Sequence, residues 1–84
     1  MKLYVIKDCK VGAYDLSTLV CSNDQVGIER NLRNLVNSGD IKNFLVSYTS
    51  DFQLWSLGEI DANTGVIKND PQLVFDLVNL KENK

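Results

Sequence analysis

The distribution of apolar and polar residues predicts short strands arranged around one helix. Residues 2–6 are apolar at both parities of a strand, a pattern typical of an interior strand that is covered on both faces. Residues 8–15 contain a glycine and polar residues and predict a loop. Residues 17–21 are β-branched and apolar, so they predict a second strand.

The next segment predicts a helix over residues 24–37. Ser22, Asn23 and Asp24 supply N-cap chemistry, because their side-chain oxygens can accept hydrogen bonds from free backbone N–H groups. Asp24 also lies at the favourable end of the helix dipole. Gly39 fits the position just after a helix end. One face of this helix is apolar, at Ile28, Leu32, Leu35 and Val36. Residues 40–51 predict an irregular connection with a possible helical turn over residues 41–46.

A strand, a turn and a returning strand are predicted over residues 52–68. Phe52, Leu54 and Ile60 share one face, which resembles a core face, whereas Trp55 and Leu57 lie on the opposite face. Residues 61–65 are a turn, because an aspartate can bond to N–H groups two residues on and a glycine can take a positive φ.

The C-terminal segment 71–81 has two interpretations. Asp70 is a candidate N-cap and Pro71 fits the first helical position, which favours a helix. The nearly continuous apolar run after Pro71 is also consistent with a strand. The sequence therefore predicts one α+β domain over residues 1–84, with a small, mostly antiparallel sheet and the order β-β-α-β-β-α, its last element a helix or a strand. Either this segment or a second copy of the chain has to cover the second face of the sheet.

The charge of the chain argues against a strongly basic nucleic-acid-binding surface. The 84 residues carry a formal net charge of −2. Six basic and five acidic residues lie in positions 1–42, whereas three basic and six acidic residues lie in positions 43–84. Since phosphate neutralisation supplies most of non-specific affinity, folding or assembly would have to create any basic patch.

The composition also disfavours catalysis. The chain has no histidine, which removes the usual general base and the commonest zinc ligand. Cys9 and Cys21 lack a Cys-x-x-Cys spacing, and no phosphate-binding glycine motif occurs. We therefore expect a non-enzymatic protein without a metal or a cofactor. No apolar run is long enough to span a membrane and no signal peptide is evident, so we expect a cytoplasmic protein with reduced thiols.

Binding remains the most plausible class of function. Aromatic side chains on a sheet can stack on bases while basic side chains hold the phosphates. The aromatic candidates are Tyr4, Tyr14, Tyr48 and Trp55, and the basic candidates are Arg30, Arg33, Lys42, Lys7 and Lys10. Trp55 and Leu57 are also candidates for an interface between subunits, since a tryptophan in an apolar strand usually buries its area.

Residues 51–65 resemble the signature of the small nonstructural protein of gokushoviruses, single-stranded-DNA bacteriophages of the microvirus family. They hold an Asp-aromatic-x-Leu-aromatic segment, then a glycine, an acidic turn and Thr-Gly. Residues 28–32 and 36–37 are similar to the family helix, which carries an arginine before an apolar residue and ends near Val-Asn. Thr49-Ser50 replaces a proline, and Glu29 replaces an apolar residue, of the family pattern.

The resemblance implies a protein that is absent from the virion, resides in the host cytoplasm, and takes part in viral single-stranded DNA synthesis or the switch to packaging. Arg30 is the one candidate functional residue that this resemblance carries over. Our first hypothesis is a phage accessory protein, as a homodimer, that binds single-stranded DNA or the replication machinery and regulates genome synthesis. Our second is a homo-oligomeric protein–protein adaptor that never touches nucleic acid.

Overall fold

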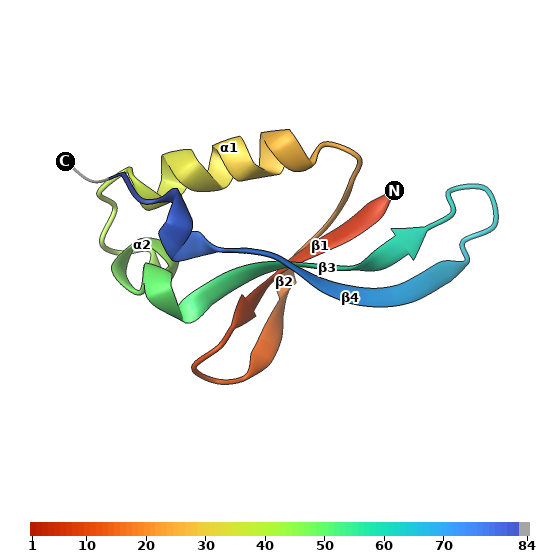
Figure 1. Cartoon of the computed structure of the whole chain (residues 1–84), viewed down its shortest axis with the longest axis horizontal. Coiled ribbons are helices and arrows are strands. Elements are labelled where there is room, and N and C mark those ends of the chain that lie inside the picture. The colour runs from red at the N-terminus through yellow and green to blue at the C-terminus, as the bar shows by residue number, and fades with distance from the viewer. Residues whose placement is uncertain (83–84) are drawn as a thin grey trace.

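A computed structural model describes residues 1–82 and shows a twisted four-stranded sheet with a helical layer on one face (Figure 1). All neighbouring strands are antiparallel, in the order β2-β1-β3-β4. The elements are β1 (Lys2–Asp8), β2 (Ala13–Ser22), α1 (Gln25–Val36), α2 (Phe44–Ser47), β3 (Phe52–Ile60) and β4 (Ile67–Asp76), with 3-10 turns η1 (Thr49–Asp51) and η2 (Leu77–Leu80).

The first two strands are longer than the sequence pattern predicted. The predicted loop 8–15 is wrong, because the turn between β1 and β2 occupies only residues 9–12. An Oδ1 atom of Asp8 accepts hydrogen bonds from the backbone N–H groups of Lys10 and Val11, at 3.0 and 3.3 Å. Gly12 then takes a φ of 79°, which closes the turn early and lets β2 begin at Ala13.

The predicted helix is confirmed, and of the three candidate N-cap residues Asp24 is the cap. Asp24 Oδ1 accepts a hydrogen bond from the backbone N–H of Gly27 at 2.8 Å. The helix α1 ends at Val36, and Gly39 has a φ of 78° just beyond it. The possible helical turn in the following connection is α2, with Asn43 as its N-cap.

The core lies between the sheet and the helical layer. It is a cluster of buried residues drawn from the central strands, α1 and η2, namely Tyr4, Ile6, Val36, Leu54, Leu77 and Leu80. Ile28 and Leu32 of α1 pack against this cluster and stay partly exposed. The core is therefore thin, and it is better covered near η2 than near the first turns of α1.

The favoured C-terminal helix is wrong, and the element order differs from the prediction at this point. Residues 67–76 continue as β4, an edge strand, and only residues 77–80 form a 3-10 turn. The pairing register shifts between Ser56 and Gly58, so Asp70 and Pro71 fall in a bulge. An edge bulge tolerates the missing N–H of a proline, so the residues that suggested a helix start belong to a strand.

The turn between β3 and β4 matches the prediction. Asp61 Oδ1 accepts from the N–H groups of Asn63 and Thr64, at 2.8 and 3.3 Å, and Gly65 takes a φ of 75°. Farther along the hairpin, Gly58 is buried with a φ of 140°, and a Cβ atom placed there would overlap the carbonyl oxygen of Lys68. The two backbones therefore meet at a spacing that only glycine allows.

The molecule is elongated, with extents of 45 × 26 × 19 Å. Both hairpins project away from the helical layer (Figure 1). Within residues 1–82, none of the helices has the length and apolar character needed to cross a membrane.

Candidate functional site

The face of the sheet opposite α1 carries no helix within residues 1–82, and we call it the open face (Figure 1). Val5 of β1 lies on this face and pairs with Trp55 of β3. Val5 is nevertheless only 1% exposed. Neighbouring side chains of the open face therefore cover this part of the sheet.

Three of these side chains form a compact cluster, Lys7, Tyr14 and Trp55, which we call the open-face cluster. The Tyr14 and Trp55 rings meet edge to face, with centroids 5.9 Å apart and planes at 83°. The Nζ atom of Lys7 lies 5.3 Å from the Tyr14 centroid and 4.9 Å from the Trp55 centroid. Both distances are within the range of a cation–π interaction.

The ladder of strands explains why these residues meet. Lys7 of β1 pairs with Tyr14 of β2 on one side and with Gln53 of β3 on the other. Trp55 is two residues beyond Gln53, so it points to the same face. The cluster thus spans three strands, and the early start of β2 brings Tyr14 into it.

Hydrogen bonds fix the orientation of the Trp55 ring. Its Nε1 atom donates to Gln53 Oε1 at 2.9 Å, and Gln53 Nε2 donates to Asp76 Oδ1 at 2.7 Å. This relay links β3 to the end of β4 and places a carboxylate near the cluster. Chemically, the site offers two aromatic rings and one ammonium group beside an acidic neighbour.

The structure separates the basic candidates that the sequence grouped together. Lys7 lies beside the half-buried rings of Tyr14 and Trp55. Lys10 instead lines a separate hollow with the exposed rings of Phe44 and Tyr48. Lys10 is at the tip of the β1–β2 turn, while Arg30 and Arg33 are exposed on α1, on the opposite layer of the molecule. Lys42 is exposed in the connection that follows α1. The two arginines therefore lie on a different layer of the molecule from Lys7.

The arginines also differ in their surroundings. Arg33 lies 3.4 Å from Glu29, one turn earlier in α1, and this is the one ion pair among the residues that the structure describes. Both side chains are largely exposed, so the pair contributes about 0.3–0.5 kcal/mol at most. Arg30 is exposed with no ion pair in the same part of the chain.

The other aromatic candidates lie elsewhere. Tyr4 is 2% exposed in the core, and its hydroxyl donates to Gln25 Oε1 at 3.0 Å. Tyr48 is exposed at the end of α2 near Phe44, with ring centroids 6.1 Å apart. Leu57 is half-buried on β3, two residues from Trp55. Its predicted role at a subunit interface stays a prediction.

Sequence reasoning missed the supporting residues of this site. Gln53 and Asp76 carry no motif, and their contact depends on the register between β3 and β4. Over residues 1–82, no group of three or more potential metal-ligating side chains comes together.

The fold is that of a small α+β protein whose open face carries two aromatic rings and a lysine side chain. The family model described as phage ORF5 protein matches residues 1–80, so the chain belongs to this family of phage proteins. A search of curated proteins and a search of solved structures each give no match.

Proposed function

We propose that this phage protein is a non-enzymatic accessory factor that binds single-stranded DNA on its open face and so regulates viral genome synthesis in the bacterial cytoplasm. The observation that carries the proposal is the position of Lys7 over the rings of Tyr14 and Trp55. Aromatic rings beside a cation on a sheet surface suit unpaired bases, which expose their π-faces, and suit the adjacent phosphate.

Binding at this site requires Lys7 to move. Its ammonium group occupies the space over the rings, where it contributes about 0.5–1 kcal/mol at an exposed site. A base stacked on an aromatic ring contributes about 1–3 kcal/mol. Replacement of the ammonium group by a base therefore lowers the free energy. The Lys7 side chain can then reach the phosphate of the same nucleotide.

The charge of the protein sets the strength and salt dependence of this binding. The net charge is −2, and the open-face cluster has one cation near the Asp76 carboxylate. We therefore propose weak binding dominated by stacking, with a shallow salt slope. One neutralised phosphate on a single strand corresponds to a slope of about −0.7 in log affinity against log salt.

The resemblance to the small nonstructural proteins of gokushoviruses supports the biological part of the proposal. It relates the chain to phages that must copy and package a single-stranded genome. A protein that covers unpaired bases weakly can influence the choice between further synthesis and packaging without blocking either. The membership in a phage family supports this setting.

Titration with a thymidine oligonucleotide, followed through Trp55 fluorescence and at several salt concentrations, tests the proposal. A stacked base is expected to quench Trp55, and Trp55→Ala is expected to weaken binding measured by anisotropy of a labelled oligonucleotide. Lys7→Met is expected to weaken binding several-fold and to flatten the salt slope by about 0.7.

The double variant Arg30→Ala, Arg33→Ala is the matched control, because it removes two cations from the opposite layer. It is expected to bind like the wild type. A loss of affinity in this control, with Lys7→Met unchanged, would move the site to α1. An absence of oligonucleotide binding at low salt would contradict the proposed function.

The adaptor hypothesis remains the second candidate, and the acidic charge of the chain favours it. The same fluorescence experiment separates the two functions. An emission spectrum of Trp55 that changes on dilution, and not on addition of oligonucleotide, supports a protein–protein role for this face.

A further inference from the structure

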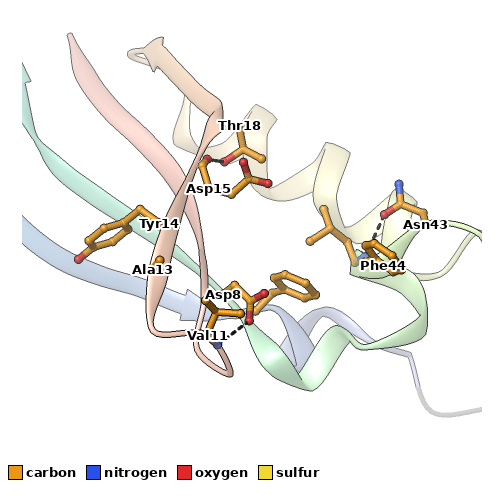
Figure 2. A pocket seen from close by; sticks show the side chains of 10 residues that line it. Asp8, Val11, Ala13, Tyr14, Asp15, Thr18, Asn43 and Phe44 are labelled. Atoms are coloured by element: carbon orange, nitrogen blue, oxygen red, sulfur yellow. Dashed lines mark hydrogen bonds between the residues drawn. The ribbon is translucent and has the colours of Figure 1, made fainter.

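An apolar groove runs between the β1–β2 hairpin and the helical layer. One part, of about 480 Å³, lies between the hairpin and α2 and is lined by Val11, Phe44 and Phe52, among others. Figure 2 shows Asp15 and Thr18 of β2 facing this hollow, with Phe44 opposite. Within the described residues, nothing fills it.

The groove continues toward the first turns of α1. A second hollow, of about 240 Å³, is lined by Val20, Ile28 and Leu32, and it shares Thr18 and Leu45 with the first. Ile28 and Leu32 are the apolar face of α1 that the thin core leaves partly exposed. The two hollows thus form one apolar channel along the inner side of β2.

The edge strand β2 adds exposed apolar side chains beside this channel. Its pairing with β1 shifts register between Tyr4 and Ile6, so residues 16–19 form a bulge. Leu16 and Leu19 in this bulge are 67% and 42% exposed, and Val20 just after it is 47% exposed. Three large apolar side chains therefore stand on a free strand edge.

The opposite edge of the sheet is protected in the usual way. Natural edge strands avoid association through charged residues and proline. Among its ten residues, β4 carries Lys68, Asp70, Pro71 and Asp76, whereas Asp15 is the single charged residue in the ten of β2. Charged residues and proline thus disfavour association at the edge strand β4, whereas the edge strand β2 is suited to contact.

The elongated chain exposes more surface than a compact monomer of its size. The chain exposes 5763 Å², which is about 700 Å² more than a compact monomer of this size is expected to expose. A standard interface buries about 800 Å² on each partner. The radius of gyration of 13.4 Å likewise exceeds the value of about 12 Å for a compact domain of this length.

We propose that a second copy of this chain occupies the groove, with β2 packed against β2 about a two-fold axis. The bulge prevents a continuous ladder, so side chains, and not backbone pairing alone, form the contact. A self-complementary surface needs projecting apolar groups next to an apolar recess, and β2 has both. Leu16 and Leu19 of each copy enter the channel of the other.

A two-fold axis through the centre of β2 brings Leu16 of one copy opposite Leu19 of its partner. The register pairs Val20 with Tyr4 and Asp15 with Ile6, so the bulge shortens the distance from Asp15 to Val20 to the rise of two extended residues, about 7 Å. The two Asp15 carboxylates are offset by only this distance along the strands, which is comparable with the screening length of about 8 Å at physiological salt. Their repulsion therefore opposes the dimer, and we expect dimerisation to strengthen as the salt concentration rises. The dimer does not depend on the proposed DNA binding.

Sedimentation velocity of the full chain without DNA, over a range of concentrations, tests the dimer. The wild type is expected to shift from monomer to dimer as its concentration rises. Leu16→Asp and Leu19→Asp are expected to weaken dimerisation about tenfold or more, because each would bury a carboxylate in an apolar contact. Both positions are exposed in the monomer, so circular dichroism is expected to stay unchanged.

Ile67→Asp is the matched control, because Ile67 is 58% exposed on β4, the edge strand that carries charged residues and proline. It is expected to dimerise like the wild type. A wild type that stays monomeric at all concentrations would overturn the proposal, and so would a dimer that Ile67→Asp breaks while Leu16→Asp leaves it intact.

The two native cysteines give an independent measurement. Both are exposed, Cys21 in β2 and Cys9 in the turn that follows β1. In the proposed dimer, Cys21 lies opposite Tyr14 of the partner, whereas Cys9 stays free. Alkylation of Cys21 is therefore expected to slow relative to Cys9 as the protein is concentrated. A constant ratio of the two rates would contradict the proposal.

Discussion

The side chain of Asn37 fastens the C-terminal turn to the end of α1, with its Nδ2 atom donating to the carbonyl oxygen of Leu80 at 2.9 Å. The same Nδ2 atom donates to the carbonyl oxygen of Arg33 at 2.8 Å, and Asn37 Oδ1 accepts from the N–H of Glu82 at 3.0 Å. One amide therefore joins three backbone groups and holds Leu80, which is 4% exposed, in the core.

Asn37→Ala is expected to lower the free energy of unfolding by about 1–3 kcal/mol, because it removes three hydrogen bonds, of which the one to the Leu80 carbonyl is partly buried. Urea denaturation gives the change. Asn34→Ala, at an exposed position of the same helix, is the control and is expected to change stability little. Equal stability of both variants would show that the contacts of Asn37 are dispensable.

Gly58→Ala is expected to be among the most damaging single substitutions in the chain. The added Cβ atom would overlap the carbonyl oxygen of Lys68, and the φ of 140° is a conformation that alanine rarely adopts. Backbone strain alone costs about 1–3 kcal/mol, and the overlap adds to it by separating β3 from β4. Thermal unfolding of the variant measures the loss.

Gly65→Ala separates the two effects. Gly65 also has a positive φ, but nothing lies within 4 Å of the Cβ position. We expect a smaller loss of about 1–2 kcal/mol, from conformational strain alone. A Gly58→Ala protein as stable as Gly65→Ala would mean that the two strands move apart easily.

Gln53→Ala is expected to free the Trp55 ring and to destabilise the protein by about 1–2 kcal/mol, since it removes two side-chain hydrogen bonds. The change also removes the partner of Asp76. Trp55 fluorescence is expected to shift to the red and to lose anisotropy. Gln72→Ala, which removes one exposed bond to Asp70, is the control and is expected to leave the Trp55 spectrum as in the wild type.

Asp24→Ala is expected to cost about 1 kcal/mol through loss of the N-cap of α1. Asp24→Asn keeps a side-chain oxygen for the N–H of Gly27 and is expected to stay within a few tenths of a kcal/mol of the wild type. Thermal unfolding monitored by circular dichroism compares the two variants. A large loss in the asparagine variant would indicate that the charge matters more than the hydrogen bond.

The sequence predicted the parts of the fold that neighbouring residues decide. Asp24 caps α1, and Asp61 and Gly65 form their turn, through bonds that span only a few residues. The prediction of a C-terminal helix was wrong because Asp70-Pro71 suits both a helix start and an edge bulge. The choice between them is made by pairing with β3, which local chemistry does not reveal.

The candidate site follows the same division. Trp55 and Lys7 were recognised by residue type, and Tyr14 was named among the aromatic candidates. Their meeting on one face depends on the register of three strands and on an early start of β2. The sequence grouped Arg30 with Lys7 as contacts of one nucleic-acid site, but α1, which carries Arg30, lies on the other side of the sheet.

The strand order also has a consequence for how the chain folds. Each hairpin closes locally, but the β1–β3 ladder joins residues about fifty positions apart, such as Tyr4 and Ser56. Contacts between distant residues carry a loop-closure cost before they stabilise anything. We expect the two hairpins to form first and the pairing of β1 with β3 to form last, in the rate-limiting step. Each hairpin would then lie on its own fragment if the chain were cut within residues 38–42, and we expect the two fragments to reassemble.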